Sequence, residues 1–373
     1  MMTHARNLLL LALAVAGVPA VAQPPARDTL VSPEVRPDRT VTFRIRAPKA
    51  AQVTLFGAWM PVGSQQPMVR DADGVWSVTV GPLAPNGYLY SFTVDGVTIA
   101  DPVNPDIKLR QRTSASLLEI PGNPPEPWEI RDVPHGAVEV SWLKSKVLDG
   151  STRQVFVYLP PGYGKSTTRY PVLYLLHGSG DVPASWTQAG KANLILDNLI
   201  ADRKAAPMIV VMPGGHAVPF GSARAVQAKN TELFEEYLVD EIVPWVEASY
   251  RTARGRENRA IAGLSMGGGQ AFNVGFAHLD LFSAIGVFSA SGGADLAGRF
   301  QQQLAHPAAT NSKLKVFWIG IGKQDAGYER AKQFSAALQG AHIEHPFVET
   351  EGGHVWAVWR WALSEYAPLL FRR

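Results

Sequence analysis

The 373-residue sequence contains no cysteine. This absence excludes disulfide bonds, metal sites built from thiolates and a cysteine nucleophile. Charged residues are also scarce, at 18% of the chain, and the formal net charge of +3 comes without blocks of basic residues. Nothing in this pattern indicates binding to nucleic acid. With 46% hydrophobic residues the chain can bury a large core, and its length is typical of two domains.

Long apolar runs are missing after the N-terminus, so the rest of the chain is expected to be soluble and not to span a membrane. At the N-terminus, MMTHARN carries an arginine, LLLLALAVAGV is apolar, and PAVAQ supplies a small-x-small cleavage site that ends at Ala22. This three-part layout is typical of a secretory signal peptide over residues 1–22. We therefore expect a mature protein that begins near Gln23 and is secreted or periplasmic.

Residues 28–118 are predicted to form an all-β domain. VTFRIR, AQVTLFG, GVWSVTV and YLYSFTV alternate apolar and polar residues with a period of two. DADG, PNG and VDGV separate these segments, and the Asp-Gly pair at 95–96 predicts a tight hairpin. Short strands at this spacing favour a β-sandwich. One face of YLYSFTV should line its core, and the residues on that face are Tyr88, Tyr90, Phe92 and Val94.

Residues 119–136 are predicted to be a proline-rich linker, because PGNPPEPWEIRDVP resists regular structure. From residue 137 to residue 373 the pattern changes to an alternation of strands and helices. The expected strands are VEVSWL, RQVFVYLP, PVLYLLHG, MIVVMP, NRAIAGLS, SAIGVFSA, KVFWIG and IEHPFVET, and helices are expected at 191–203, 231–250 and 327–340. Continuous apolar strands separated by helices imply an α/β domain whose mostly parallel sheet is covered on both faces.

The segment GLSMG at 263–267 lies between the strand NRAIAGL and a helix that should begin near Met266. A bare G-x-S-x-G match is common by chance, but this position is the sequence context of a nucleophile elbow. The turn would lift the hydroxyl of Ser265 above the sheet edge. Gly263 and Gly267 are expected because a Cβ at either position would clash with neighbouring backbone. The helix N-terminus would also offer N–H groups to a developing oxyanion.

A serine nucleophile needs a base and an acid that orients the base, and in α/β hydrolases they follow the serine in the order acid, then histidine. Asp325 follows the strand KVFWIG, and His354 follows the strand IEHPFVET, so both occupy loops at strand ends. Asp295 is an alternative acid, although SASGGAD gives it no clear position at a strand end. The other downstream histidines are expected to be structural or exposed: His278, His306, His342 and His345.

Two backbone N–H groups would complete an oxyanion hole, that of Met266 and that of Ser179 in the loop HGSGD after the strand PVLYLLHG. His177 is expected to shape this loop, with a direct role at the substrate as the alternative. Trp186 follows a few residues later and could either line an aromatic acyl pocket or pack beneath the loop. Three further tryptophans after the catalytic histidine are expected to pack a helix: Trp356, Trp359 and Trp361.

Several of these motifs recur in a known order. PVLYLLHGSGD, SWTQAGKANLILDNLI, MIVVMPGGH, GLSMGG, IGKQD and GGHVW together resemble the esterase D-like branch of the α/β hydrolases. Within that branch, residues 137–373 resemble carbohydrate esterase family 1, the feruloyl and acetylxylan esterases. This resemblance implies the same catalytic triad and the same two oxyanion donors that the residues themselves indicate.

The N-terminal segments also resemble a known group. VTFRIRAPKAAQVTLFGAW, DADGVWSVTVGPL, GYLYSFTVDG and DPVNP are similar to the early-set β-sandwiches, which include the family 48 carbohydrate-binding modules. The resemblance implies an immunoglobulin-like fold, with sugar binding as a weaker expectation. Trp59 lies in a predicted loop and could stack on a sugar or pack at a domain interface. Trp76 alternates with valines and should belong to the core.

The sequence therefore predicts a secreted serine esterase that removes acyl groups, feruloyl first and acetyl second, from plant cell-wall polysaccharide such as xylan. An acylated polysaccharide or oligosaccharide is the expected partner. We expect no nucleic acid, membrane or obligate protein partner, and no metal or cofactor. The same triad would serve a siderophore esterase or a sugar acyltransferase. A carbohydrate-binding protein with an inactive hydrolase domain is the alternative of another class, which the intact triad disfavours.

Overall fold

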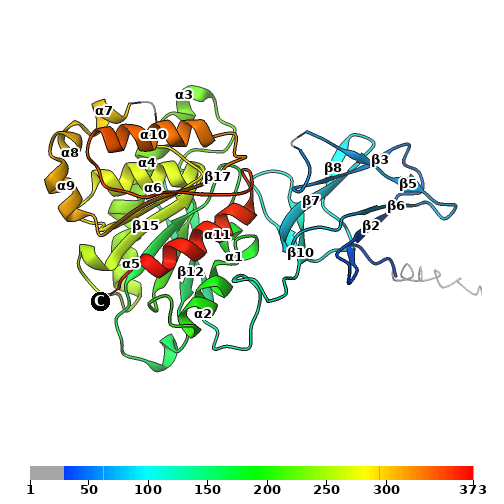
Figure 1. Ribbon diagram of the computed structural model, residues 1–373, viewed down its shortest axis with the longest axis horizontal. Coiled ribbons are helices and arrows are strands. Elements are labelled where there is room, and N and C mark those ends of the chain that lie inside the picture. The colour runs from blue at the N-terminus through cyan, green and yellow to red at the C-terminus, as the bar shows by residue number, and fades with distance from the viewer. Residues whose placement is uncertain (1–28, 62, 294, 373) are drawn as a thin grey trace, which may run out of the picture.

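The computed structural model describes residues 29–61, 63–293 and 295–372. The predicted signal peptide lies outside these residues. Figure 1 shows two units side by side, a β-sandwich formed by the N-terminal part of the chain and an α/β unit formed by the rest. Within the described residues, no helix combines the length and the apolar character that a membrane span requires.

The N-terminal unit is a sandwich of two antiparallel sheets, as the alternation predicts. The first sheet has the order β1 (Glu34–Val35), β2 (Val41–Arg46), β6 (Val75–Val80), β5 (Val69–Arg70). The second has the order β4 (Gln66–Pro67), β3 (Val53–Gly57), β7 (Asn86–Val94), β10 (Ala115–Ile120), β9 (Ile107–Lys108), with β8 (Val97–Ile99) paired to β7. Apolar side chains from both sheets form one core between them.

Strand β7 lies in the middle of the second sheet and shows how the sandwich is built. Tyr90 and Phe92 point into the core and are almost completely buried, and Trp76 of β6 joins them there. The hairpin from β7 to β8 has only Asp95 and Gly96 in its loop, with φ angles of 47° and 85°. Two positive φ angles are what a type I′ turn requires, so the predicted tight hairpin is confirmed.

The C-terminal unit contains one eight-stranded sheet. Its order is β11 (Ala137–Lys144), β12 (Thr152–Leu159), β14 (Ile209–Pro213), β13 (Val172–Leu176), β15 (Arg259–Leu264), β16 (Ala284–Phe288), β17 (Val316–Gly322), β18 (Phe347–Thr350). The pairs β11–β12 and β12–β14 are antiparallel, and every other pair is parallel. This is the mostly parallel sheet that the continuous apolar strands predict.

Helices cover both faces of this sheet (Figure 1). One face carries α4 (Asn230–Glu236), α5 (Val243–Ser249), α6 (Met266–Ala277) and α10 (Tyr328–Gly340), and the other carries α1 (Ser185–Gln188), α2 (Ala192–Ala201) and α11 (Trp356–Tyr366). The single helix predicted over 231–250 is interrupted by a π-helical turn at Tyr237–Ile242. Pro244 explains the interruption, because it lacks the N–H that would donate to Asp240 in an α-helix. Shorter helices lie in the connections: α3 (Arg224–Gln227), α7 (Leu296–Arg299), α8 (Gln301–Ala305) and α9 (Pro307–Lys313).

The outer face of the second sandwich sheet is covered by the α/β unit. Residues 121–136, between β10 and β11, contain no helix or strand. Trp128 in this stretch and Leu117 of β10 are nevertheless buried in the apolar cluster beneath α2 and α11, and Leu89 of β7 packs against the same cluster. Strand β7 therefore contributes alternate residues to two different cores.

A buried arginine joins the two units at this interface. Arg360 of α11 is completely buried, and its guanidinium donates hydrogen bonds of 3.0 and 2.7 Å to the carboxylate of Glu119 on β10. Its Nε donates to the carbonyl oxygen of Ala189 at 2.7 Å. Gly87 of β7 packs directly on this guanidinium, since a Cβ at that position would lie 2.3 Å from its nitrogens. Bidentate geometry and close packing fix how the units meet.

Candidate active site

Ser265 occupies a strained turn between β15 and α6. Its φ of 52° and ψ of −118° are rare for a residue with a side chain, and such strain is typical of functional turns. A Cβ on Gly263 would lie 2.5 Å from the backbone of Gly267. A Cβ on Gly267 would lie 2.6 Å from the carbonyl oxygens of Leu176 and His177. Both glycines are therefore required by close backbone approach, as the sequence predicts for a nucleophile elbow.

The serine, the histidine and the aspartate predicted from the sequence lie together. Nε2 of His354 is 2.9 Å from Oγ of Ser265, and Nδ1 of His354 is 2.7 Å from Oδ2 of Asp325. Asp325 is buried, and the N–H of Gly327 donates to its other oxygen at 2.7 Å. Burial alone would raise the pKa of Asp325, but the hydrogen bonds from His354 and Gly327 outweigh burial and lower it. The carboxylate therefore stays ionised and holds the Nδ1 proton of the imidazole.

The alternative residues have other roles. The exposed carboxylate of Asp295 caps α7 by accepting a hydrogen bond of 2.9 Å from the N–H of Gly298. His278 pairs with Glu235 at 2.9 Å. In the described part of the chain, none of the alternative histidines is hydrogen-bonded to the nucleophile: His278, His306, His342 and His345.

The loop after β13 lies beside the nucleophile. Its residues 178–181 form a turn closed by a hydrogen bond of 3.2 Å from the N–H of Asp181 to the carbonyl oxygen of Gly178. A Cβ on Gly178 would lie 3.4 Å from the Cβ of Ser265. The N–H groups of Ser179 and Met266 donate to no other group within the described residues. Both are therefore available to an oxyanion at this serine.

Two buried histidines hold this loop. Nδ1 of His177 donates to the carbonyl oxygen of Gly178 at 2.9 Å, and its Nε2 accepts from the N–H of Gly215 at 2.9 Å. Nε2 of His216 accepts from the N–H of Gly180 at 3.1 Å. Burial lowers the pKa of both histidines to about 4, so both rings are neutral acceptors at neutral pH. His177 therefore shapes the loop, and His216, the last residue of the motif MIVVMPGGH, has a matching role that the sequence did not reveal.

Two tryptophans considered for substrate contact are packing residues. Trp186 is 0% exposed, and its indole N–H donates to the carbonyl oxygen of Leu176 at 3.0 Å. Its ring packs edge-on against Trp356 beneath the oxyanion loop, which is the second of its two expected roles. Trp59 stacks on Phe43 with ring centroids 5.6 Å apart, against the sandwich core. Neither ring lines the cavity at Ser265.

That cavity has a volume of about 340 Å³ and is lined by both units. Ser265, His354 and Ser179 lie in its wall together with Trp356 and Trp359, whose contribution beyond helix packing the sequence did not reveal. The ring centroids of Trp359 and His354 lie 5.0 Å apart, and the two rings are nearly perpendicular. The sandwich supplies the opposite wall from β3, β7 and β9 and the residues that follow them, including Phe56, Met60, Tyr88, Leu89, Lys108 and Arg110.

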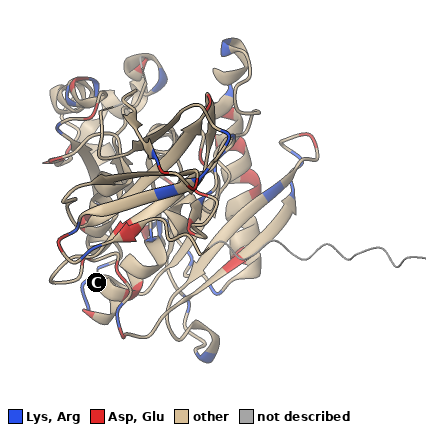
Figure 2. Cartoon of the chain, turned by 90° about the vertical axis from the view of Figure 1, so that its right-hand side faces the viewer, with Lys and Arg blue, Asp and Glu red and all other residues tan. Residues whose placement is uncertain are grey.

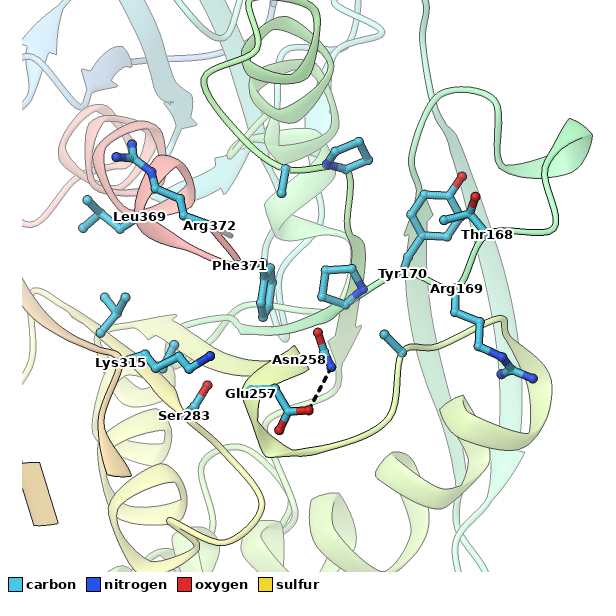
Figure 3. Close-up of a pocket in the computed structure, with 16 residues that line it drawn as sticks. Thr168, Arg169, Tyr170, Glu257, Asn258, Ser283, Lys315, Leu369, Phe371 and Arg372 are labelled. Atoms are coloured by element: carbon cyan, nitrogen blue, oxygen red, sulfur yellow. Dashed lines mark hydrogen bonds between the residues drawn. The ribbon is translucent and has the colours of Figure 1, made fainter. Parts of the chain in front are cut away.

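A second cavity, of about 680 Å³, lies at the opposite end of the sheet (Figure 3). Residues just before β13, β16 and β17 line it together with Phe371 and Arg372, and Asn258 donates to Glu257 at 3.3 Å in its wall. In parallel sheets, ligands bind outside the carboxyl ends of the strands, whereas this cavity lies at the amino ends. Ser265 and His354 line the first cavity and not this one, so the first is the candidate active site.

Basic and acidic residues are nearly equal in number, at 35 and 32. Figure 2 shows basic and acidic residues interspersed over the sandwich side of the molecule. In residues 29–61, 63–293 and 295–372, no group of three or more histidine and carboxylate side chains is placed to hold a metal ion. At the first cavity the described residues offer a serine hydroxyl, an imidazole beside it and two free N–H groups.

Known families match both units. A model for esterases ("Putative esterase") matches residues 145–370, and a model for carbohydrate-binding module 48 (isoamylase N-terminal domain) matches residues 31–105. The chain belongs to the esterase family. This esterase is 33% identical over 353 residues to an endo-1,4-beta-xylanase/feruloyl esterase of Xylanibacter ruminicola, a match that covers 91% of this chain and 46% of the relative. The chain spans about half the length, or less, of the curated relatives that it matches.

Solved structures resemble the same esterase. A ferulic acid esterase is 28% identical with a TM-score of 0.52, over 63% of this chain and 97% of that chain. A CE1 ferulic acid esterase from Anaeromyces mucronatus, solved with ferulic acid, is 25% identical with a TM-score of 0.57, over 65% of this chain and 93% of that chain. The enterobactin esterase of Shigella flexneri is 20% identical with a TM-score of 0.66 over 88% of this chain and 92% of its own, a likeness of fold alone that extends over both units.

Proposed function

We propose that this esterase is a serine carboxylic-ester hydrolase that removes acyl groups, feruloyl in the first place, from plant cell-wall polysaccharide such as xylan. One observation carries the proposal: Ser265 and His354, which are hydrogen-bonded in the triad, open onto an aromatic-walled cavity of about 340 Å³. The relative named as a xylanase/feruloyl esterase and the neighbour solved with ferulic acid support it.

The reaction follows from the geometry of the triad. Asp325 accepts a hydrogen bond from Nδ1–H of His354, which leaves the lone pair on Nε2 directed at the hydroxyl of Ser265. The serine oxygen attacks the ester carbonyl while the imidazole takes its proton, and the oxyanion is stabilised by the N–H groups of Met266 and Ser179. The imidazolium then protonates the ester oxygen of the sugar as its bond to the acyl carbon breaks, and the sugar leaves with a free hydroxyl. Water then attacks the acyl-enzyme while His354 takes its proton. The imidazolium returns this proton to the oxygen of Ser265 as the acid leaves.

The walls of the cavity favour an aromatic acyl group. Phe56, Leu89, Trp356 and Trp359 give it apolar surface, and an aromatic ring gains more free energy from such a wall than a methyl group does. An acetyl group would leave most of the cavity unfilled, which is why acetylxylan comes second. Siderophore esters and acyl transfer to a sugar would use the same triad, and the products of the reaction distinguish them.

We also propose that the protein acts outside the cytoplasm. The support for this is the signal-peptide pattern of residues 1–22, which lie outside the described residues. A plant polysaccharide is a polymer that reaches the enzyme outside the cell, so the proposed location and the proposed substrate agree.

The proposed acyl specificity is tested by comparing methyl ferulate with methyl acetate. We expect kcat/KM to be higher for the ferulate by about tenfold or more, since burying a ring contributes well over 1.4 kcal/mol. Phe56→Ala should reduce this preference without slowing hydrolysis of the acetate, because Phe56 lies in the cavity wall that the sandwich supplies, whereas the triad belongs to the α/β unit. Ser265→Ala should lower turnover on both esters by about 10⁴- to 10⁶-fold.

Assays on feruloylated and acetylated xylan extend the comparison to the polymer. Release of ferulic acid from the first substrate by the wild type, and not by Ser265→Ala, is the expected result. Faster hydrolysis of methyl acetate than of methyl ferulate would contradict the feruloyl assignment and leave the serine mechanism in place.

A further inference from the structure

A short segment of the sandwich, residues 108–111, reaches across to the oxyanion loop of the α/β unit. The N–H of Gln111 donates to the carbonyl oxygen of Gly180 at 2.8 Å, and the side-chain amide of Gln111 donates to the carbonyl oxygen of Asp181 at 3.1 Å. Nζ of Lys108 forms an ion pair with the carboxylate of Asp181. The sandwich thus holds the 178–181 turn at three points.

The ion pair in this set is buried. The side chains of Lys108 and Asp181 are only 2% and 9% exposed, and both line the cavity that contains the nucleophile. Nζ of Lys108 also lies 5.6 Å from the centre of the ring of Trp356, at the start of α11. Burial lowers the pKa of Lys108, and the carboxylate of Asp181 opposes this shift. Because desolvation offsets much of the attraction in such a pair, stability alone is a weak reason for it, and a role in fixing geometry fits better.

The geometry that the pair fixes is that of the oxyanion turn. Asp181 is the last residue of the turn, and its N–H closes the turn onto Gly178. Gly180 has a φ of 76°, which at the third position is typical of a type II turn. The direction of the Ser179 N–H is set by the position of this turn, so a displacement of Asp181 moves the donor.

We propose that Lys108 is a positioning residue for the oxyanion hole. It holds Asp181 from the sandwich so that the N–H of Ser179 stays directed at the carbonyl oxygen under attack at Ser265. The inference rests on the proposed ester hydrolysis through Ser265. Its consequence is that the sandwich governs turnover even of a small ester that carries no sugar.

The test is Lys108→Met in the full chain, assayed on 4-nitrophenyl acetate. We expect kcat per titrated active site to fall by about 10- to 100-fold, since a misplaced oxyanion donor loses transition-state stabilisation. KM should change little. The inhibition constant of phenylboronic acid, which forms a tetrahedral adduct on Ser265, should rise by a similar factor. A merely structural role would lower the fraction of active sites and leave kcat per site and the inhibition constant unchanged.

Two further variants keep the test decisive. Lys49→Met removes an exposed lysine of the same sandwich and should leave all three measurements at the wild-type values. Gln111→Ala removes one hydrogen bond to the carbonyl oxygen of Asp181 at an exposed residue, so it does not threaten folding as Lys108→Met does. It should lower kcat by about two- to tenfold with KM unchanged.

The pairing itself is tested by Asp181→Asn and by the double variant Lys108→Met/Asp181→Asn. If the two residues act together, the double variant loses much less than the product of the two single losses. Multiplicative losses, or a kcat within about twofold of wild type in both Lys108→Met and Gln111→Ala, would overturn the proposal. A wild-type protein that hydrolyses 4-nitrophenyl acetate but no feruloyl ester would refute the proposed substrate only and leave this inference intact.

Discussion

His177 and His216 should make the folded state sensitive to mild acid. His177 is 1% exposed, and its Nε2 already accepts a hydrogen bond from a backbone N–H. Protonation would bury a charge and break that bond. Burial lowers its pKa to about 4, whereas a histidine in the unfolded chain titrates near 6.5. The folded pKa is the lower one, so its contribution to stability is complete above about pH 6.5 and is lost as the pH falls toward 4.

The size of the effect follows from the two pKa values. For His177 alone the loss amounts to about 3 kcal/mol over this window, at a slope of up to about 1.4 kcal/mol per pH unit. His216 adds to this loss, because burial also lowers its pKa to about 4. A change of this size is a large part of the total stability of a typical domain.

Urea unfolding followed by tryptophan fluorescence between about pH 7 and pH 4.5 measures the slope. His177→Gln keeps a donor and an acceptor but cannot titrate, so its free energy of unfolding should fall less steeply than that of the wild type. His278→Gln is the matched control. The hydrogen bond to Glu235 raises the pKa of His278, so removing that histidine should make the acid slope steeper. Identical slopes for the wild type and His177→Gln would refute the reasoning.

Two further predictions concern the acid of the triad and the N-terminus. Asp325→Asn should lower turnover on 4-nitrophenyl acetate by about 10⁴-fold, because it favours the wrong tautomer of His354. Asp295→Asn should leave turnover within about twofold, since Asp295 only caps α7. The reverse ranking would assign the acid role to Asp295. N-terminal sequencing of the protein recovered outside the cytoplasm should begin at Gln23, and a start at Met1 would contradict the predicted cleavage.

The proximity of the three candidate triad residues was predictable because their signals are local. Ser265 lies between a strand and a helix, and Asp325 and His354 each follow a strand, so the order of elements along the chain is enough to bring them to one edge of the sheet. The sandwich was predictable for a similar reason, since alternation along a strand reports directly on its two faces.

The contacts between the units were not predictable in this way. Lys108 and Asp181 lie 73 positions apart, and Arg360 and Glu119 lie 241 positions apart. No periodicity connects residues across such distances. The two-residue strand that carries Lys108 is also too short to produce a pattern. Trp186 illustrates the same limit, because its sequence neighbours do not reveal that the loop turns its indole inward to Leu176.

The two-sided burial of β7 has a consequence for biosynthesis. Chains are made from the N-terminus, and domains generally fold as they emerge, so the sandwich can form long before α11 exists. Until then Leu89 and its neighbours on the outer face of β7 have no covering helix, and Glu119 lacks the guanidinium of Arg360. A nascent chain stalled ahead of α11 would leave Leu89 and Leu117 without this helix to cover them. Helix α11, which follows the sandwich by more than 200 positions, therefore completes the packing of the sandwich.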